Sequence, residues 1–357
     1  MPNRLNSPYF ILQKEKLQRN LDKFKSLSIY TAVRFLYTLK GFDHKEGLPQ
    51  IANSLSGFSI GNLNELAKIA EYKDKYIHTY SPAYYASEVL PLAKASTTMS
   101  FNSLTQWERY HKICSSQTSI GLRINPKIPL NQPSYCDSSN NKFGVAYSKF
   151  ILLYQRDREL FKDLEGLHFH IFCHQDISAL LSLLEHIDNR YRDILPSLKW
   201  LNLGGGQDFT SEKYDSQEFV KAIHKLKGKY PHITIYFEPC SSVVSDIGEF
   251  YATVLDIIED SPSIAILNTS IETHLLDIAI TKKRLKIKNA SHYKTPYKYQ
   301  LSGMSCIAGD TIGTYYFDAP LIIGETIIFE DMIGYTVVKQ TTFNGIDNAK
   351  LISVSSG

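Results

Sequence analysis

The sequence has few cysteines, and none lie in the short pairs that mark metal sites. The five are widely spaced and odd in number, and no Cys-x-x-Cys motif joins any two of them: Cys114, Cys136, Cys173, Cys240 and Cys306. Common zinc sites and disulfide frameworks both depend on recurring cysteine spacings, so the sequence predicts neither, and no metal site is expected. Unpaired thiols are typical of a reduced compartment, and we expect a cytoplasmic protein.

Long apolar runs and blocks of like charge are also lacking. The 357 residues carry 39 Lys and Arg against 36 Asp and Glu, a formal net charge of +3. This small excess is not typical of a nucleic-acid-binding protein. No stretch approaches the roughly 20 apolar residues of a membrane span. The segment Met1–Leu17 is polar and has no apolar signal core. From the small net charge we expect no nucleic-acid partner, and from the lack of long apolar runs we expect no membrane partner.

Short apolar runs alternate with amphipathic stretches over the first two thirds of the chain, as in βα units. Eight strands are predicted at Tyr30–Leu39, Phe58–Ile60, Tyr76–Tyr80, Thr97–Phe101, Ile120–Ile124, Gly166–Ile171, Trp200–Leu203 and Ile233–Phe237. Predicted helices include Lys14–Leu27, Asn62–Ala70, Ser103–Ile113, Ser148–Leu160, Ile177–Arg190 and Asp215–Lys227. Eight such units predict a (β/α)8 TIM barrel, with a doubly wound sheet as the alternative.

After about Val243, strand-like runs replace helices. They lie at Tyr251–Ile257, Ile264–Asn268, Leu321–Ile323, Thr326–Phe329 and Gly334–Gln340. This change predicts a second, antiparallel β domain of residues 246–357, to which residues 1–12 add a strand, while residues 13–245 form the barrel. Pro, Asn and Ser cluster at 126–141, where we expect a loop over the barrel mouth.

A lysine ends the first predicted strand. The run Phe35-Leu36-Tyr37-Thr38-Leu39 is apolar, and Lys40 follows it directly. A charged amine in this position must reach solvent, find a partner or lose its proton. One interpretation is a lysine that extends to solvent. The other is a desolvated amine suited to Schiff-base chemistry with pyridoxal phosphate (PLP).

Polar residues or glycines follow three more predicted strands, at the barrel end where function is expected. The glycines Gly204, Gly205 and Gly206 would let backbone N–H groups close on a phosphate. His170 could stack on the cofactor ring, and Glu238 could keep a pyridine nitrogen protonated. Each also has a simpler interpretation, as a flexible turn, an ordinary core or surface histidine, or a polar strand end.

Several motifs, taken in order, give the chain a resemblance to a known family. They are Thr38–Phe42, Phe101–Leu104, Ile120–Pro126, Gly166–His170, Trp200–Gly206, Cys306–Asp310, Phe329–Met332, Gly334–Thr336 and Thr342–Gly345. With these motifs the chain resembles the fold-type III PLP decarboxylases, which combine an alanine-racemase-like barrel with a β domain. Within them it is most similar to the carboxynorspermidine/carboxyspermidine decarboxylases.

The resemblance implies a PLP cofactor and a role for each matched residue. Lys40 would form the Schiff base, His170 would stack on the ring and Glu238 would pair with the pyridine nitrogen. Gly204–Gly206 and Tyr335 would contact the phosphate. Cys306 would protonate the α-carbon, and both Cys306 and Asp310 would come from a second subunit. The resemblance therefore also implies a homodimer with shared active sites and a small amino-acid substrate.

The chain departs from the resembled family near the expected mouth. Carboxylates of the family pattern are replaced by His174, Ser241 and Ile280, and the basic run Lys282–Arg284 follows. The substrate-binding positions carried over are Asp310, His174, Ser241, Asp277 and His274. Fewer carboxylates favour a substrate whose tail is neutral or acidic. The main hypothesis is thus an α-decarboxylase of a molecule such as citryl-ornithine, on a rhizoferrin-type siderophore route.

Three alternatives remain open. The first is a true carboxynorspermidine/carboxyspermidine decarboxylase of polyamine biosynthesis. The second is a non-catalytic PLP-binding protein, against which the presence of Lys40, Glu238 and Cys306 counts. The third is an alanine-racemase-like isomerase, although the two-base arrangement of such enzymes lacks this cysteine.

Overall fold

The structure is a computed structural model that describes residues 8–128 and 141–355. Cys136 and most of the predicted 126–141 loop lie outside these residues. The chain divides into two compact units. The barrel unit contains residues 20–40 and 49–243. The β unit contains the chain up to Arg19, residues 41–48 and the chain from Val244 onward.

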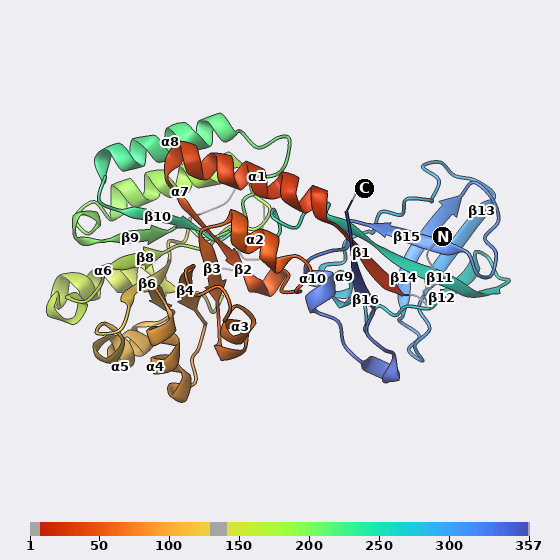
Figure 1. Cartoon of the computed structure of the whole chain (residues 1–357), viewed down its shortest axis with the longest axis horizontal. Coiled ribbons are helices and arrows are strands. Elements are labelled where there is room, and N and C mark those ends of the chain that lie inside the picture. Colours follow the sequence, from red (N-terminus) through yellow and green to blue (C-terminus); the bar gives the residue numbers. More distant parts are fainter. Residues whose placement is uncertain (1–7, 129–140, 356–357) are drawn as a thin grey trace. The chain divides into compact units, whose positions relative to one another are not determined.

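The barrel unit is a closed ring of eight parallel strands, drawn at the centre of its helices in Figure 1. The strands are β2 (Arg34–Thr38), β3 (Gly57–Ile60), β4 (Tyr76–Tyr80), β5 (Thr98–Phe101), β6 (Ser119–Asn125), β8 (Gly166–His168), β9 (Trp200–Asn202) and β10 (Thr234–Phe237). The sheet runs β5-β4-β3-β2-β10-β9-β8-β6, and β5 pairs with β6 to close it. A doubly wound sheet would have two open edges, so the closure confirms the TIM barrel. The two-residue β7 (Val145–Ala146) adds to β6.

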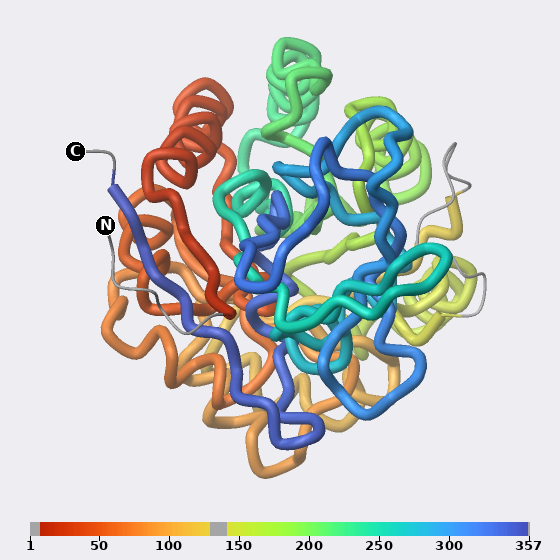
Figure 2. The backbone as a smooth tube through the Cα atoms, turned by 90° about the vertical axis from the view of Figure 1, so that its right-hand side faces the viewer, coloured from red at the N-terminus to blue at the C-terminus, as the bar shows by residue number. Residues whose placement is uncertain are grey.

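Helices form a ring around these strands (Figure 2). They are α1 (Lys14–Thr31), α2 (Leu48–Ser54), α3 (Leu63–Lys68), α4 (Ala86–Ala95), α5 (Leu104–Cys114), α6 (Tyr147–Arg156), α7 (Ile177–Arg190) and α8 (Ser216–Lys229). Side-chain caps define several starts: Ser103 accepts a hydrogen bond from the Gln106 amide, and Asp215 accepts one from the Glu218 amide. The predicted strand Tyr30–Leu39 is wrong at its start because α1 continues to Thr31.

A tryptophan fills the barrel interior at the end where the strands begin. Trp200 is the first residue of β9 and packs with Leu36 and Tyr236 in a buried cluster. Two glycines make room for it: a Cβ on Gly166 would lie 2.0 Å from the indole, and one on Gly121 would lie 2.5 Å from it.

The β unit contains a seven-stranded sheet in the order β14-β13-β12-β11-β1-β16, with β15 paired to β11. Its strands are β1 (Tyr9–Gln13), β11 (Gly248–Ile258), β12 (Ser263–Leu267), β13 (Tyr297–Ser302), β14 (Thr311–Phe317), β15 (Thr326–Glu330) and β16 (Lys350–Val354). Most pairs are antiparallel, as predicted, but β12–β13 and β1–β16 are parallel. The N-terminal segment contributes the strand β1, which pairs with β11 and β16.

Two predicted strands of this unit are wrong. Leu321–Ile323 lies in the loop before β15, where Leu321 is buried but Ile322 and Ile323 are 65% and 64% exposed. Within Gly334–Gln340 the chain forms the short helix α10 (Tyr335–Val338), which begins after Gly334 with φ of +118°. Helix α9 (Leu276–Thr281) also lies in this unit. Among the helices in the described ranges, none has the length and apolar character needed to cross a membrane.

Candidate functional site

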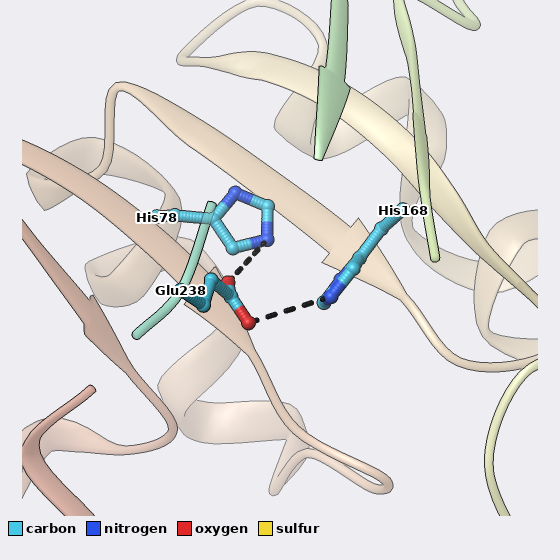
Figure 3. A group of neighbouring side chains, drawn as sticks. All are labelled: His78, His168 and Glu238. Carbon is cyan, nitrogen blue, oxygen red and sulfur yellow. Dashed lines mark ion pairs between the residues drawn. The ribbon is translucent and has the colours of Figure 1, made fainter. Parts of the chain in front are cut away.

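A buried carboxylate at the end of β10 organises the polar end of the barrel. Glu238 directly follows the strand and is only 3% exposed. Its Oε1 accepts a 2.8 Å hydrogen bond from Asn202 Nδ2, and its Oε2 lies 3.2 Å from His170 Nδ1. Two further imidazoles approach from opposite sides (Figure 3), with His78 Nε2 at 3.7 Å and His168 Nε2 at 3.5 Å. Side chains from β4, β8 and β9, and His170 just after β8, thus point at one carboxyl group from different parts of the barrel wall.

The charge of this cluster follows from its burial. Burial lowers the pKa of His170 and of His168 to about 4 and that of His78 to about 3, so all three rings are neutral at pH 7. Burial alone would raise the pKa of Glu238, but the surrounding imidazoles outweigh it and hold that pKa well below its usual range. The ion-pair partners of Glu238 in the described chain are these histidines alone. At neutral pH the site therefore holds a buried anion without a cationic partner.

The glycine turn after β9 lies directly against this carboxylate. Gly204 and Gly206 have positive φ values of +71° and +87°, which favour glycine. A Cβ on Gly205 would lie 2.1 Å from the Glu238 carbonyl oxygen. The Gly204 amide donates to Asn202 Oδ1, but those of Gly205 and Gly206 have no hydrogen-bond partner within the described residues. Unpartnered amides in a glycine turn fit an anion such as a phosphate.

The structure does not desolvate Lys40. The residue lies in a 3-10 turn, Leu39–Gly41, two residues after β2 ends at Thr38, and its side chain is exposed. Of the two interpretations of Lys40, this exposure favours the lysine that extends to solvent, because the chain leaves the barrel wall before it. Its charge still reaches the site, since the nearby Lys40 ammonium contributes to the lowered pKa of His170.

Three residues of this end were not among the predicted site residues. Asn202 links Glu238 to Gly204, and His78 approaches Glu238 from β4. Arg123 is 6% exposed, donates a 2.7 Å hydrogen bond to the His170 carbonyl and stacks on Tyr80 at 4.5 Å. Each of the three is a polar residue within a predicted strand, and this position in the sequence could have identified it as a candidate.

In the β unit, Cys306 and Asp310 share the loop between β13 and β14. Cys306 is exposed, and its amide donates to Asn344 Oδ1 at 2.8 Å. Asp310 is 2% exposed, and its carboxylate accepts hydrogen bonds from Ser305 Oγ at 2.6 Å and from the Ile271 amide at 2.8 Å. In this chain the Asp310 carboxylate shapes the loop that presents Cys306.

Several predicted substrate-binding residues have other partners. His274 is fully buried, with Nδ1 3.0 Å from Thr269 Oγ1 and Nε2 2.9 Å from the Asp347 carbonyl, so both of its ring nitrogens already have partners within the β unit. Asp277 on α9 accepts a hydrogen bond from Lys339 Nζ at 2.5 Å. Lys339 also lies 4.8 Å from the centre of the half-buried Tyr335 ring.

The positions that suggested an acid-binding mouth are also largely paired. His174 is exposed, with Nδ1 3.1 Å from Asp208 Oδ1. In the β unit, Lys283 pairs with Asp331 at 3.3 Å, and Arg284 donates to the Thr314 carbonyl at 2.7 Å. Ser241 is half-buried in the turn after Glu238, and Ile280 on α9 is 51% exposed. Lys283 and His174 thus each lie beside an acidic side chain of their own unit.

Comparisons with known proteins identify close relatives over nearly the whole chain. It is 32% identical to the carboxynorspermidine/carboxyspermidine decarboxylase of Campylobacter jejuni, over 96% of this chain and 91% of that protein. It is 34% identical to the carboxyaminopropylagmatine decarboxylase of Synechocystis sp., over 96% of this chain and 88% of that protein. No family model matches the sequence.

Solved structures that are similar to this chain are also decarboxylases. The crystal structure of the C. jejuni carboxynorspermidine decarboxylase complexed with norspermidine is similar at a TM-score of 0.88 and 32% identity, covering 98% of this chain and 95% of that one. An SrLDC mutant solved in complex with PLP is 18% identical with a TM-score of 0.78, covering 98% of this chain and 92% of that one, and it shows the shared fold.

Proposed function

The chain belongs to the carboxynorspermidine/carboxyspermidine decarboxylase family of fold-type III enzymes, and we propose that it uses PLP to decarboxylate an amino acid with a polyamine-like tail. The alternatives of a non-catalytic binding protein and of an isomerase lose their support, because the relatives are decarboxylases. Cofactor identity, residue roles and substrate tail are the parts that we propose.

The observation that carries the cofactor proposal is the unbalanced charge of Glu238. A buried carboxylate whose neighbours are an amide and three neutral imidazoles is costly unless a cation joins it. A protonated pyridine nitrogen would supply that cation, while the free amides of Gly205 and Gly206 suit a phosphate on the same molecule. The residues therefore fit a phosphorylated pyridine.

Four residues of the chain would each have a separate role in the reaction. When bound, PLP accepts the electron pair released as the carboxylate leaves. Lys40 Nζ would hold the cofactor covalently, and its exposure leaves it accessible to an incoming substrate amine. The ionised Glu238 would keep the pyridine nitrogen protonated, and the His170 ring, held by its hydrogen bond to Glu238, would lie against the cofactor. Cys306 Sγ would deliver a proton to the α-carbon.

We further propose a homodimer in which Lys40 of one protomer works with Cys306 of its partner. The resemblance to the family supports this arrangement, and the two residues belong to different compact units of the chain. Mixing Lys40→Ala with Cys306→Ala protein tests it directly. Activity should return in the mixture, because some dimers then contain one site with both residues; a mixture as inactive as its components would contradict sharing.

For the substrate tail, the alternative hypothesis of a polyamine-type substrate is the supported one. The two relatives above act on carboxynorspermidine or carboxyspermidine and on carboxyaminopropylagmatine, all amino acids with cationic tails by their names. The main hypothesis of an acid-tailed siderophore precursor is not supported. Its charge argument is also weakened, because His174, Lys283 and Arg284 already have partners of their own.

Carbon dioxide release from purified, PLP-loaded protein tests the proposal. Carboxynorspermidine, carboxyaminopropylagmatine and citryl-ornithine should be compared at matched concentrations, with Lys40→Ala protein as the blank. We expect kcat/KM to be highest for one of the two cationic-tailed substrates. A preference for citryl-ornithine would refute the proposed cationic substrate tail, but it would still support the proposal that the protein is a decarboxylase.

A further inference from the structure

Two histidines of the Glu238 cluster have no role in the function proposed above. His78 lies inside β4 and His168 ends β8, and both side chains are completely buried. Their rings meet edge to face with centroids 5.2 Å apart, and both direct Nε2 towards the same carboxyl group (Figure 3). Buried imidazoles cost free energy unless their nitrogens are satisfied, so their presence in an otherwise well-packed interior needs a reason.

The orientation of His78 is set from the strand beside it. Its Nδ1 lies 2.7 Å from Thr98 Oγ1, and its Nε2 lies 3.2 Å from Ser100 Oγ. Both hydroxyls belong to β5, and Thr98 is the residue paired with His78 in the sheet. The ring is therefore held from both sides, with Nε2 facing Glu238 Oε1 at 3.7 Å.

The ring nitrogens of His168 have fewer hydrogen-bond partners than those of His78. Neither of its ring nitrogens has a hydrogen-bond partner among the described residues, and its Nε2 lies 3.5 Å from Glu238 Oε2. A neutral imidazole must carry one N–H, and leaving it unpaired in the interior costs about 1–3 kcal/mol. The Glu238 carboxylate is an acceptor within reach of this nitrogen, so the N–H belongs on Nε2, directed at the carboxylate.

We propose that His78 and His168 are positioning residues that keep Glu238 ionised and fixed in orientation, one imidazole at each carboxylate oxygen. The consequence for the cofactor rests on the proposed function: an ionised Glu238 is what would hold a pyridine nitrogen protonated. The effect on Glu238 itself does not depend on it, because it arises within the protein alone.

Other charged and titratable groups face the same cluster and remain in every variant. Tyr80 and Tyr84 lie close enough for Glu238 to raise their pKa values, although burial is the main cause of both shifts. Arg123 and Lys40 act on His170, which donates the third imidazole contact. Removing His78 or His168 thus isolates their own contribution.

Infrared spectroscopy of the cofactor-free protein is the direct test. A protonated carboxylic acid has a carbonyl band distinct from that of a carboxylate, and subtraction of the Glu238→Gln spectrum assigns the band to Glu238. In the natural protein this band should be missing throughout the neutral range. In His168→Leu protein it should appear at higher pH, because burial then acts on Glu238 without the N–H that His168 directs at it. His78→Leu should shift it in the same direction but less, because His78 Nε2 lies 3.7 Å from the carboxylate and also meets Ser100 Oγ.

Two variants and a second measurement separate this role from simple packing. His168→Gln retains an N–H near the position of Nε2 and should restore the natural spectrum, which a purely structural role does not predict. His111→Leu is the matched control, since His111 is another buried histidine of the barrel unit, bonded to the Trp107 carbonyl. Hydrogen bonds to charged groups contribute about 1.5–3 kcal/mol, so His168→Leu protein should also bind PLP about 10-fold or more weakly at pH 7.

The outcomes are distinguishable. A Glu238 band that titrates at the same pH in the natural and leucine proteins would overturn the proposal, as would a protonated Glu238 in the natural protein at pH 7. If the band shifts as expected but the natural protein binds no PLP, the proposed function fails and the role of the two histidines stands. A circular dichroism spectrum of each variant shows whether it is folded.

Discussion

The glycine turn after β9 allows a sharp prediction, because the structure gives the contact that a single methyl group would make. In Gly205→Ala the new Cβ would lie 2.1 Å from the Glu238 carbonyl oxygen, far inside van der Waals contact and against backbone that cannot rotate away. Relief requires the turn and the end of β10 to separate. Overpacking of this kind typically costs about 1–3 kcal/mol of stability. The displacement would also move Glu238 and the Gly205 amide, so cofactor affinity should fall as well.

The same unit provides a matched control. Gly228 lies in α8, and a Cβ there would meet no heavy atom within 4 Å. Gly228→Ala should therefore stabilise the protein by about 0.5–1 kcal/mol, the usual difference between the two residues in a helix. Urea unfolding of the cofactor-free proteins measures both changes, and a titration with PLP measures affinity. Equal stability of Gly205→Ala and the natural protein would refute the close packing, and unchanged affinity would refute the phosphate role.

Three more predictions follow from the site. Borohydride reduction of the PLP-loaded protein should attach the cofactor to Lys40; a label on Lys45 in the peptide map would contradict the strand register. Cys306→Ala should slow turnover by about 10²–10⁴-fold with little change in PLP affinity, since a positioned acid contributes on that scale, and natural kinetics would remove Cys306 from the mechanism. The three imidazoles around Glu238 have folded-state pKa values of about 3 to 4, below the ordinary 6.5, so the unfolded chain binds more protons as the pH falls. Stability should therefore be level above about pH 7 and fall between about pH 6.5 and pH 4; a melting temperature that is constant over that range would contradict neutral rings.

Much of the barrel could be predicted because its strands follow a local rule. Apolar runs of four to eight residues separated by amphipathic stretches are visible without any tertiary information. Helix α7 was predicted at Ile177–Arg190, where it lies, with Asp176 as its cap. The β unit was harder, because half-buried strands such as β13 and β14 carry tyrosines and threonines that differ little from loop composition. Conversely, an apolar run was predicted as a strand where the chain forms a loop, and its isoleucines at 322 and 323 are exposed.

The sequence by itself determined the residue types of the site and the strand after which each one comes. Parallel strands in a closed ring end at one rim, so His170, the glycine turn and Glu238 had to come together once the barrel was recognised. Only the tertiary structure decided which groups meet. The approach of His78 to Glu238 joins residues 160 positions apart, and the partners that occupy His274 and Lys283 depend on packing within the β unit. The order of strands and helices along the chain was thus enough to predict the architecture. The charges that balance one another depend on distances between remote residues, which a local sequence pattern does not contain.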